Sequence, residues 1–120
     1  MKHVTIPQTA EDHYFTALDH FAAGELDAAI AEYKQAIAKD PAFTDAMHGL
    51  IRALQDSGAL DDAIAVAHRL AEQSPDDILA HTSLSILYQR KGMVPEAEAE
   101  ANKARVLGWK QQLRGQKGKG

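Results

Sequence analysis

The sequence contains no cysteine and no long apolar run. Without cysteine the chain can form no disulfide framework, no thiolate nucleophile and no cysteine-based metal site, which favours a reducing, cytoplasmic environment. No window approaches the roughly 18 consecutive apolar residues that a membrane span needs. The N-terminus also lacks the apolar stretch of a secretory signal. We therefore expect a soluble cytoplasmic chain without a membrane span.

Acidic residues are missing from the last eighteen positions, residues 103–120, which carry six lysines and arginines. Residues 1–102 contain seven basic and seventeen acidic residues, a balance of −10. The pattern predicts an acidic body with a solvated basic tail, and the alternative is docking of the tail to an acidic partner, a membrane surface or a nucleic acid. Six cations without interleaved aromatic residues are too few for a nucleic-acid site, so we expect no nucleic-acid partner.

Motifs that carry catalysis or bind cofactors are also missing. The chain has no Gly-rich phosphate loop, no nucleophile elbow and no His-Glu-x-x-His pattern. His13 and His20 lie seven residues apart without a third ligand nearby, so we expect no metal site. The carboxylates fall mostly in first helical turns or on outer faces, whereas an acid–base pair needs an enclosing pocket. We expect a protein that is not an enzyme and binds no cofactor.

A step of 34 residues relates glycine, alanine and proline positions. The repeated residues are Gly24, Gly58 and Gly92; Ala29, Ala63 and Ala97; and Pro41 and Pro75. Glycine can take a positive φ and reverse the chain after a helix, and alanine allows two helices to approach closely. Alanine and leucine outnumber valine and isoleucine, which favours helices over strands. The pattern predicts three helix pairs joined by tight turns.

Several residues predict where helices begin. Thr9 with Asp12 three positions later is typical of a capping box, with Asp in place of Glu. Asp40–Pro41 and Ser74–Pro75 each fit an N-cap followed by a first helical proline, where no hydrogen bond is lost. Pro95 fits the first turn of the last helix for the same reason.

The period and its punctuation resemble the tetratricopeptide repeat over about residues 10 to 109. The resemblance implies an all-α, right-handed superhelical stack of three antiparallel helix pairs with a short C-terminal capping segment. The expected helices are 9–23, 26–39, 42–56, 60–73, 76–91 and 94–107. Gly108 is expected to end the last of these, and Trp109 and Leu113 to cover the end of the stack from a short helix over 109–114.

The expected domain plan follows from these helices. It consists of an N-terminal extension (1–8), a three-repeat domain (9–114, with repeats near 10–43, 44–77 and 78–109) and a disordered basic tail (115–120).

The first helix departs from the family pattern. At the usual inward places it offers His13, Thr16, Ala17 and His20. Its apolar residues form a helical stripe rotated by about one residue: Tyr14, Phe15, Leu18, Phe21 and Ala22. Either the helix rolls to bury this stripe, with Val4 and Ile6 folded against it, or the stripe is an apolar wall of the binding groove.

Tetratricopeptide domains typically bind a peptide or helix in a concave groove lined by the first helix of each repeat. The resemblance places the groove residues at Tyr14, Phe15, Leu18, Phe21, His48, Arg52, Leu79, Ile86 and Arg90. Gly49 would let a ligand approach the helix backbone. The cationic and amide residues of the chaperone-binding carboxylate clamp are missing from the matching places. We expect a protein-interaction module that binds another protein, or alternatively itself as a scaffold unit, through the first-repeat apolar patch.

Overall fold

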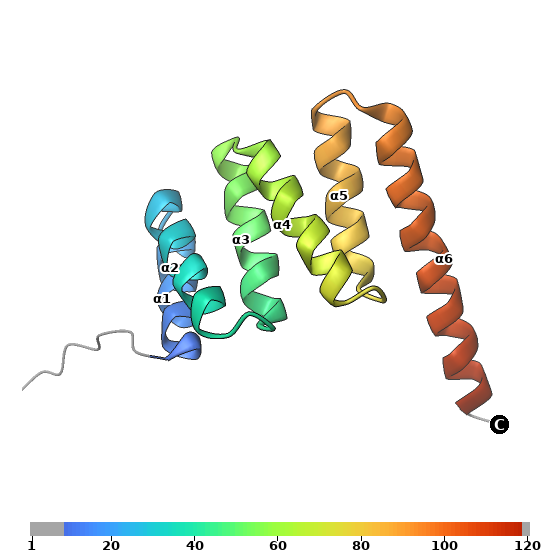
Figure 1. Cartoon of the computed structure of the whole chain (residues 1–120), viewed down its shortest axis with the longest axis horizontal. Helices are drawn as coiled ribbons and strands as arrows, with labels where there is room; N and C mark the ends of the chain where they lie inside the picture. The colour runs from blue at the N-terminus through green and yellow to red at the C-terminus, as the bar shows by residue number, and fades with distance from the viewer. Residues whose placement is uncertain (1–8, 119–120) are drawn as a thin grey trace, which may run out of the picture. The chain divides into compact units, whose positions relative to one another are not determined.

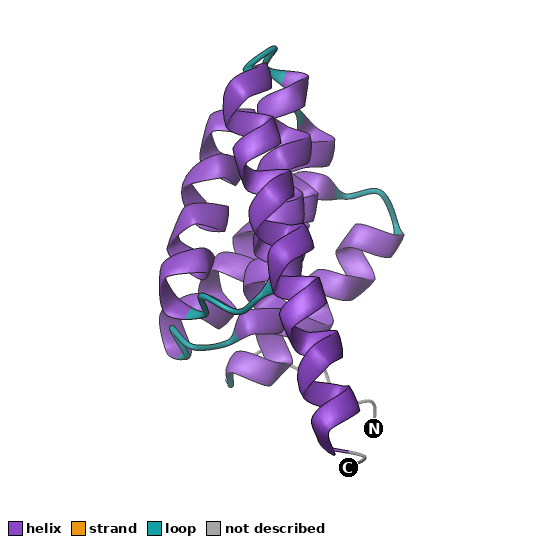
Figure 2. Cartoon of the chain, turned by 90° about the vertical axis from the view of Figure 1, so that its right-hand side faces the viewer, coloured by secondary structure: helices purple, strands orange, loops and turns teal. Residues whose placement is uncertain are grey.

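Six α-helices make up nearly all of residues 9–118, the part of the chain that the computed structural model describes (Figure 1). They are α1 (Ala10–Ala22), α2 (Leu26–Lys39), α3 (Thr44–Ser57), α4 (Leu60–Gln73), α5 (Ile78–Arg90) and α6 (Val94–Gly118). Figure 2 shows only helices and loops in this part of the chain. The predicted all-helical fold is confirmed. The N-terminal extension, with Val4 and Ile6, lies outside the described residues.

The chain divides into two compact units, residues 1–66 and 67–120, and the boundary falls within α4. In the first unit α1 packs on α2, and α3 packs on both of them. In the second unit α5 packs on α6. His68 in the last half of α4 joins α5 through a hydrogen bond between its Nε2 and the Tyr88 hydroxyl, 2.6 Å long.

The turn within each helix pair contains a glycine in the left-handed region. The φ angles are +78° at Gly24, +87° at Gly58 and +75° at Gly92, as the repeat predicted. Other residues pay a steric cost there because of their Cβ atoms. The three glycines therefore explain why each pair turns at the same point of the repeat.

Thr9 begins α1 with the predicted capping box. Its hydroxyl accepts from the Asp12 backbone N–H at 3.0 Å, and the Asp12 carboxylate accepts from the Thr9 N–H at 3.2 Å. Two donors of the first helical turn are thereby satisfied.

The two Xaa-Pro pairs do not start helices, so that prediction is wrong. Asp40 is the C-cap of α2, with an extended backbone of the kind that a following proline favours. Its side chain accepts from the Ala42 N–H at 3.1 Å, and its carbonyl accepts from the Phe43 N–H at 3.0 Å. This turn delays α3 to Thr44. A matching bond from the Asp77 N–H to the Ser74 carbonyl, 2.9 Å long, precedes α5, whose N-cap is Asp77.

The last helix is longer than predicted. α6 continues through Gly108, which lacks a positive φ, and ends at Gly118. Glycine ends a helix most often by taking a left-handed backbone conformation, and Gly108 does not take it. The separate capping helix is therefore wrong. Trp109 and Leu113 are 64% and 43% exposed rather than covering the repeat. Residues 115–118, expected to be disordered, are helical.

Small residues occupy the centre of each helix pair. Ala29 and Ala63 are fully buried and Ala97 is 2% exposed, as their place in the repeat predicted. Larger apolar side chains are buried as well, among them Met47, Ile51 and Leu54 in the first unit and Leu70, Leu84 and Leu87 in the second. The core of each unit thus combines close helix approach with apolar burial.

Tyr33 fills the space beside Gly49. The tyrosine is 1% exposed, and a Cβ added at Gly49 would lie 2.5 Å from its Cζ atom. Burial and, second, the neighbouring Tyr14 phenol raise the pKa of Tyr33, so its hydroxyl stays neutral at physiological pH. Gly49 therefore accommodates a core ring, and the prediction that it lets a ligand approach the backbone is wrong.

Two glycine-to-alanine substitutions test this packing. We expect Gly49→Ala to lower the free energy of unfolding by about 1–3 kcal/mol, because the methyl group displaces the Tyr33 ring. Gly108→Ala is the matched control, since its Cβ would meet only Ile78 Cδ1 at 4.0 Å. The control should raise the free energy by up to about 1 kcal/mol through helix propensity. Urea denaturation measures both, and equal stabilisation would contradict the Tyr33 contact.

Candidate functional site

The exposed face of α1 carries apolar side chains. Phe15 is 58% and Leu18 38% exposed, while Tyr14 and Phe21 are half-buried. His13 and Ala17 are buried instead. The helix therefore does not roll to bury the whole stripe. It turns His13 and Ala17 inward and leaves part of the stripe exposed.

Aromatic packing holds this face in place. The Tyr14 ring packs near two others, with centroid distances of 6.1 Å to Tyr33 and 5.1 Å to Phe43. Phe15 lies 5.6 Å from Tyr14 on the outer side. Tilted aromatic pairs at these distances stabilise each other beyond simple burial. Tyr14 is thus a support for the face, and Phe15 and Leu18 are its accessible residues.

α3 adds polar residues beside the stripe. The Arg52 guanidinium lies 5.8 Å above the Phe21 ring, a cation–π arrangement, and its Nε lies 3.5 Å from the Asp56 carboxylate. Its side chain is nevertheless 67% exposed. His48 is half-buried on the same helix. We define the α1–α3 face as Tyr14, Phe15, Leu18, Phe21, His48 and Arg52, which are the predicted groove residues of the first unit.

The remaining predicted groove residues belong to α5 in the second unit. Leu79 is 61% and Ile86 43% exposed, and they lie seven residues apart on one helix face. Arg90 is exposed in the last turn of the same helix.

A hydrogen-bonded His–Glu pair that sequence reasoning missed lies in each outer repeat. His13 Nδ1 lies 2.7 Å from Glu32 Oε1, and His81 Nδ1 lies 2.8 Å from Glu100 Oε1. Both histidines and both glutamates are related by twice the 34-residue step, and the central repeat has Met47 and Val66 in the matching places. The repeat register could have predicted these pairs, because it aligns His13 with His81 and Glu32 with Glu100.

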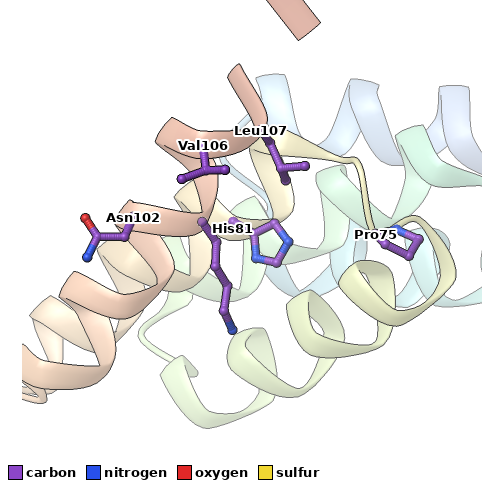
Figure 3. A pocket seen from close by; sticks show the side chains of 6 residues that line it. Pro75, His81, Asn102, Val106 and Leu107 are labelled. Carbon is purple, nitrogen blue, oxygen red and sulfur yellow. The ribbon is translucent and has the colours of Figure 1, made fainter. Parts of the chain in front are cut away.

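The second pair lies beside a hollow of about 410 Å³ between α5 and α6 (Figure 3). Its lining residues are Pro75, His81, Asn102, Lys103, Val106 and Leu107. The Glu100 side chain is 8% exposed, and Lys103 Nζ donates to its second oxygen at 2.9 Å. Burial alone would raise the pKa of Glu100, but hydrogen bonds from His81 and Lys103, together with their charges, lower that pKa.

Residues 9–118 contain neither a candidate metal site nor a candidate membrane span. No group of three or more His, Asp or Glu side chains there is placed to hold a metal ion. Within the same range, no helix is both long enough and apolar enough to cross a bilayer.

The family profile of the tetratricopeptide repeat matches residues 20–87, more than half of the chain. Together with the six helices and their 34-residue step, this match shows that the chain belongs to the tetratricopeptide repeat family. No curated protein matches the sequence.

Solved structures with the same fold include MamA, SycD and YrrB. The chain is similar to MamA with a TM-score of 0.85 and 28% identity, over 89% of this chain and 63% of MamA. The secretion translocator chaperone SycD of Yersinia enterocolitica gives 0.78 and 21%, over 82% and 73%. YrrB, described as a protein with an unusual peptide-binding site, gives 0.79 and 19%, over 83% and 52%. The chain thus spans less than two thirds of the MamA and YrrB chains.

The Glu100 carboxyl predicts a pH dependence of stability. Because folding lowers this pKa, the unfolded chain binds protons more readily than the folded one. The contribution of Glu100 to stability is therefore fully present above the ordinary value of 4.5 and is lost as the pH falls through the lower, folded value. We expect Glu100→Gln to lower stability at neutral pH by about 1.5–3 kcal/mol, because it removes charge-assisted hydrogen bonds.

The same substitution should flatten the acid limb of a plot of unfolding free energy against pH. Glu98→Gln is the matched control, since Glu98 is exposed on the same helix. An identical acid limb in the Glu100→Gln variant and the parent would show that Glu100 is not the linked group.

Proposed function

We propose that this chain is a non-catalytic interaction module whose α1–α3 face binds a partner peptide or an amphipathic helix. The observation that carries the proposal is the exposure of Phe15 and Leu18, 58% and 38%, on a face whose Tyr14 ring packs on Tyr33 and Phe43. Exposed apolar side chains that adjoin in this way are typical of interaction sites. A cytoplasmic location is part of the same proposal.

The chemistry of the face favours an apolar ligand with some polar groups. Phe15 and Leu18 would receive the apolar side chains of the ligand, and Arg52 can donate hydrogen bonds to its backbone carbonyls or a carboxylate. Because the contact is mainly apolar, binding should depend only weakly on salt. Membership in the tetratricopeptide repeat family and the peptide-binding description of YrrB support this kind of ligand.

The exposed residues of α5 form a separate candidate contact. Leu79, Ile86 and Arg90 combine two exposed apolar side chains and a cation on one helix. They match the α1–α3 face in composition, which supports a role in binding the same class of ligand.

A double substitution tests the proposal. Amphipathic helical peptides are selected on the immobilised chain, and their affinities are measured by fluorescence anisotropy. We expect Phe15→Ala/Leu18→Ala to weaken binding at least about tenfold, because each buried apolar anchor contributes ~1–3 kcal/mol. Tyr14 is unsuited to this test, since its ring packs on Tyr33 and Phe43.

Val94→Ala is the control, because Val94 is 51% exposed and lies at the start of α6. It should bind as the parent does, and circular dichroism should show equal helix content in all three proteins. Unchanged affinity in the folded double variant would place the binding site elsewhere.

A further inference from the structure

The second half of α6 carries an apolar stripe that no segment in residues 9–118 covers. Val106, Trp109 and Leu113 are 44%, 64% and 43% exposed. Their spacing of three and four residues places them on one side of the helix. Trp109 and Val106 also line a shallow hollow on this helix with Arg105, Gly108 and Gln112. We call Val106, Trp109 and Leu113 the α6 stripe.

Positive charge accompanies the α6 stripe. Lys110 and Arg114 each follow a stripe residue by one position, and α6 has no acidic residue after Glu100. Lys103 and Arg105 are engaged within the helix, by Glu100 and Asn102. In the described part of the chain, by contrast, no carboxylate forms an ion pair with Lys110 or Arg114. The ligand of this stripe should therefore be both apolar and acidic.

The α1–α3 face has these two properties. Phe15 and Leu18 share α1 with the exposed carboxylates of Glu11 and Asp19, each four residues from Phe15. α3 adds the exposed carboxylate of Asp45. The described residues of the first unit, 9–66, contain eleven acidic and three basic side chains, a balance of −8. An anionic membrane would attract α6 but repel this unit.

We infer that the occupant of the α1–α3 face is the α6 stripe of a second copy of this chain. The inference rests on the face proposed above and names its ligand. Trp109 and Leu113 of one copy lie against Phe15 and Leu18 of the next, and Lys110 and Arg114 lie against its carboxylates. The two surfaces differ, so the contact is heterologous and each copy offers one of each. Association therefore closes into a ring, of which a reciprocal dimer is the smallest, or continues into an open chain.

Sedimentation velocity over a range of protein concentrations tests the inference. The parent should associate as its concentration rises, and added salt should shift the series only weakly toward monomer, because the contact is mainly apolar and the ion pairs contribute a smaller part. Trp109→Ser/Leu113→Ser and Phe15→Ser/Leu18→Ser should each weaken self-association at least about tenfold. Lys110→Glu/Arg114→Glu changes only exposed charges and should weaken it as well. Val94→Ser is the control and should associate as the parent does.

Mixing the two apolar variants separates a heterologous contact from a symmetric one. The Trp109/Leu113 variant keeps an intact α1–α3 face, and the Phe15/Leu18 variant keeps an intact α6 stripe. Together they should form a one-to-one complex that grows no further. A mixture that stays monomeric while the parent associates would overturn the inference, and so would a parent that is monomeric at every concentration.

The outcome also distinguishes the two proposals. If the parent is monomeric but its selected peptides need Phe15 and Leu18, the proposed function holds and the inference fails. If Phe15→Ser/Leu18→Ser associates as the parent does while the α6 variants do not, the α1–α3 face is wrong as the receptor. Circular dichroism of every variant excludes unfolding as the cause.

Discussion

Close approach of paired helices is the constraint on which the rest of this structure depends. It requires small residues where the helices cross, and Ala29, Ala63 and Ala97 supply them with at most 2% exposure. In the first unit the same closeness leaves room for the Tyr33 ring only because residue 49 is glycine. Tyr14 then packs on Tyr33, and this packing leaves Phe15 on the outside. The candidate binding face is thus a consequence of how the core is filled.

The repeat made much of this fold predictable. Gly24, Gly58 and Gly92 all have the positive φ that their place between helices implies. The capping box at Thr9 was predictable because it depends only on residues three positions apart. Errors arose where one residue type serves two roles. Asp40 ends α2 and closes the following turn through its side chain instead of starting the next helix, and Gly108 continues a helix instead of ending it.

The candidate site was less predictable than the fold. Periodicity identified the stripe on the first helix, but its orientation depends on a partner that lies elsewhere in the sequence. His13 Nδ1 lies 2.7 Å from Glu32 Oε1, and this pair holds the polar side of α1 inward. The exposed stripe on α6 was missed because the helix was expected to end before Trp109. Both cases depend on tertiary contacts or helix length, which a local pattern does not determine.

The outer repeats contain a His–Glu pair that the matching positions of the central repeat lack, and this difference has a consequence for folding. Repeat proteins contain several similar helices, and pairing a helix with the wrong copy of its partner is a characteristic misfolding route. If α1 paired with α4 in place of α2, His13 would face Val66, and Met47 on α3 would face Glu100 if α3 paired with α6. Each mispairing buries a polar group without its partner, at a cost of about 1–3 kcal/mol. The two His–Glu pairs therefore disfavour pairing between a helix of an outer repeat and a helix of the central repeat.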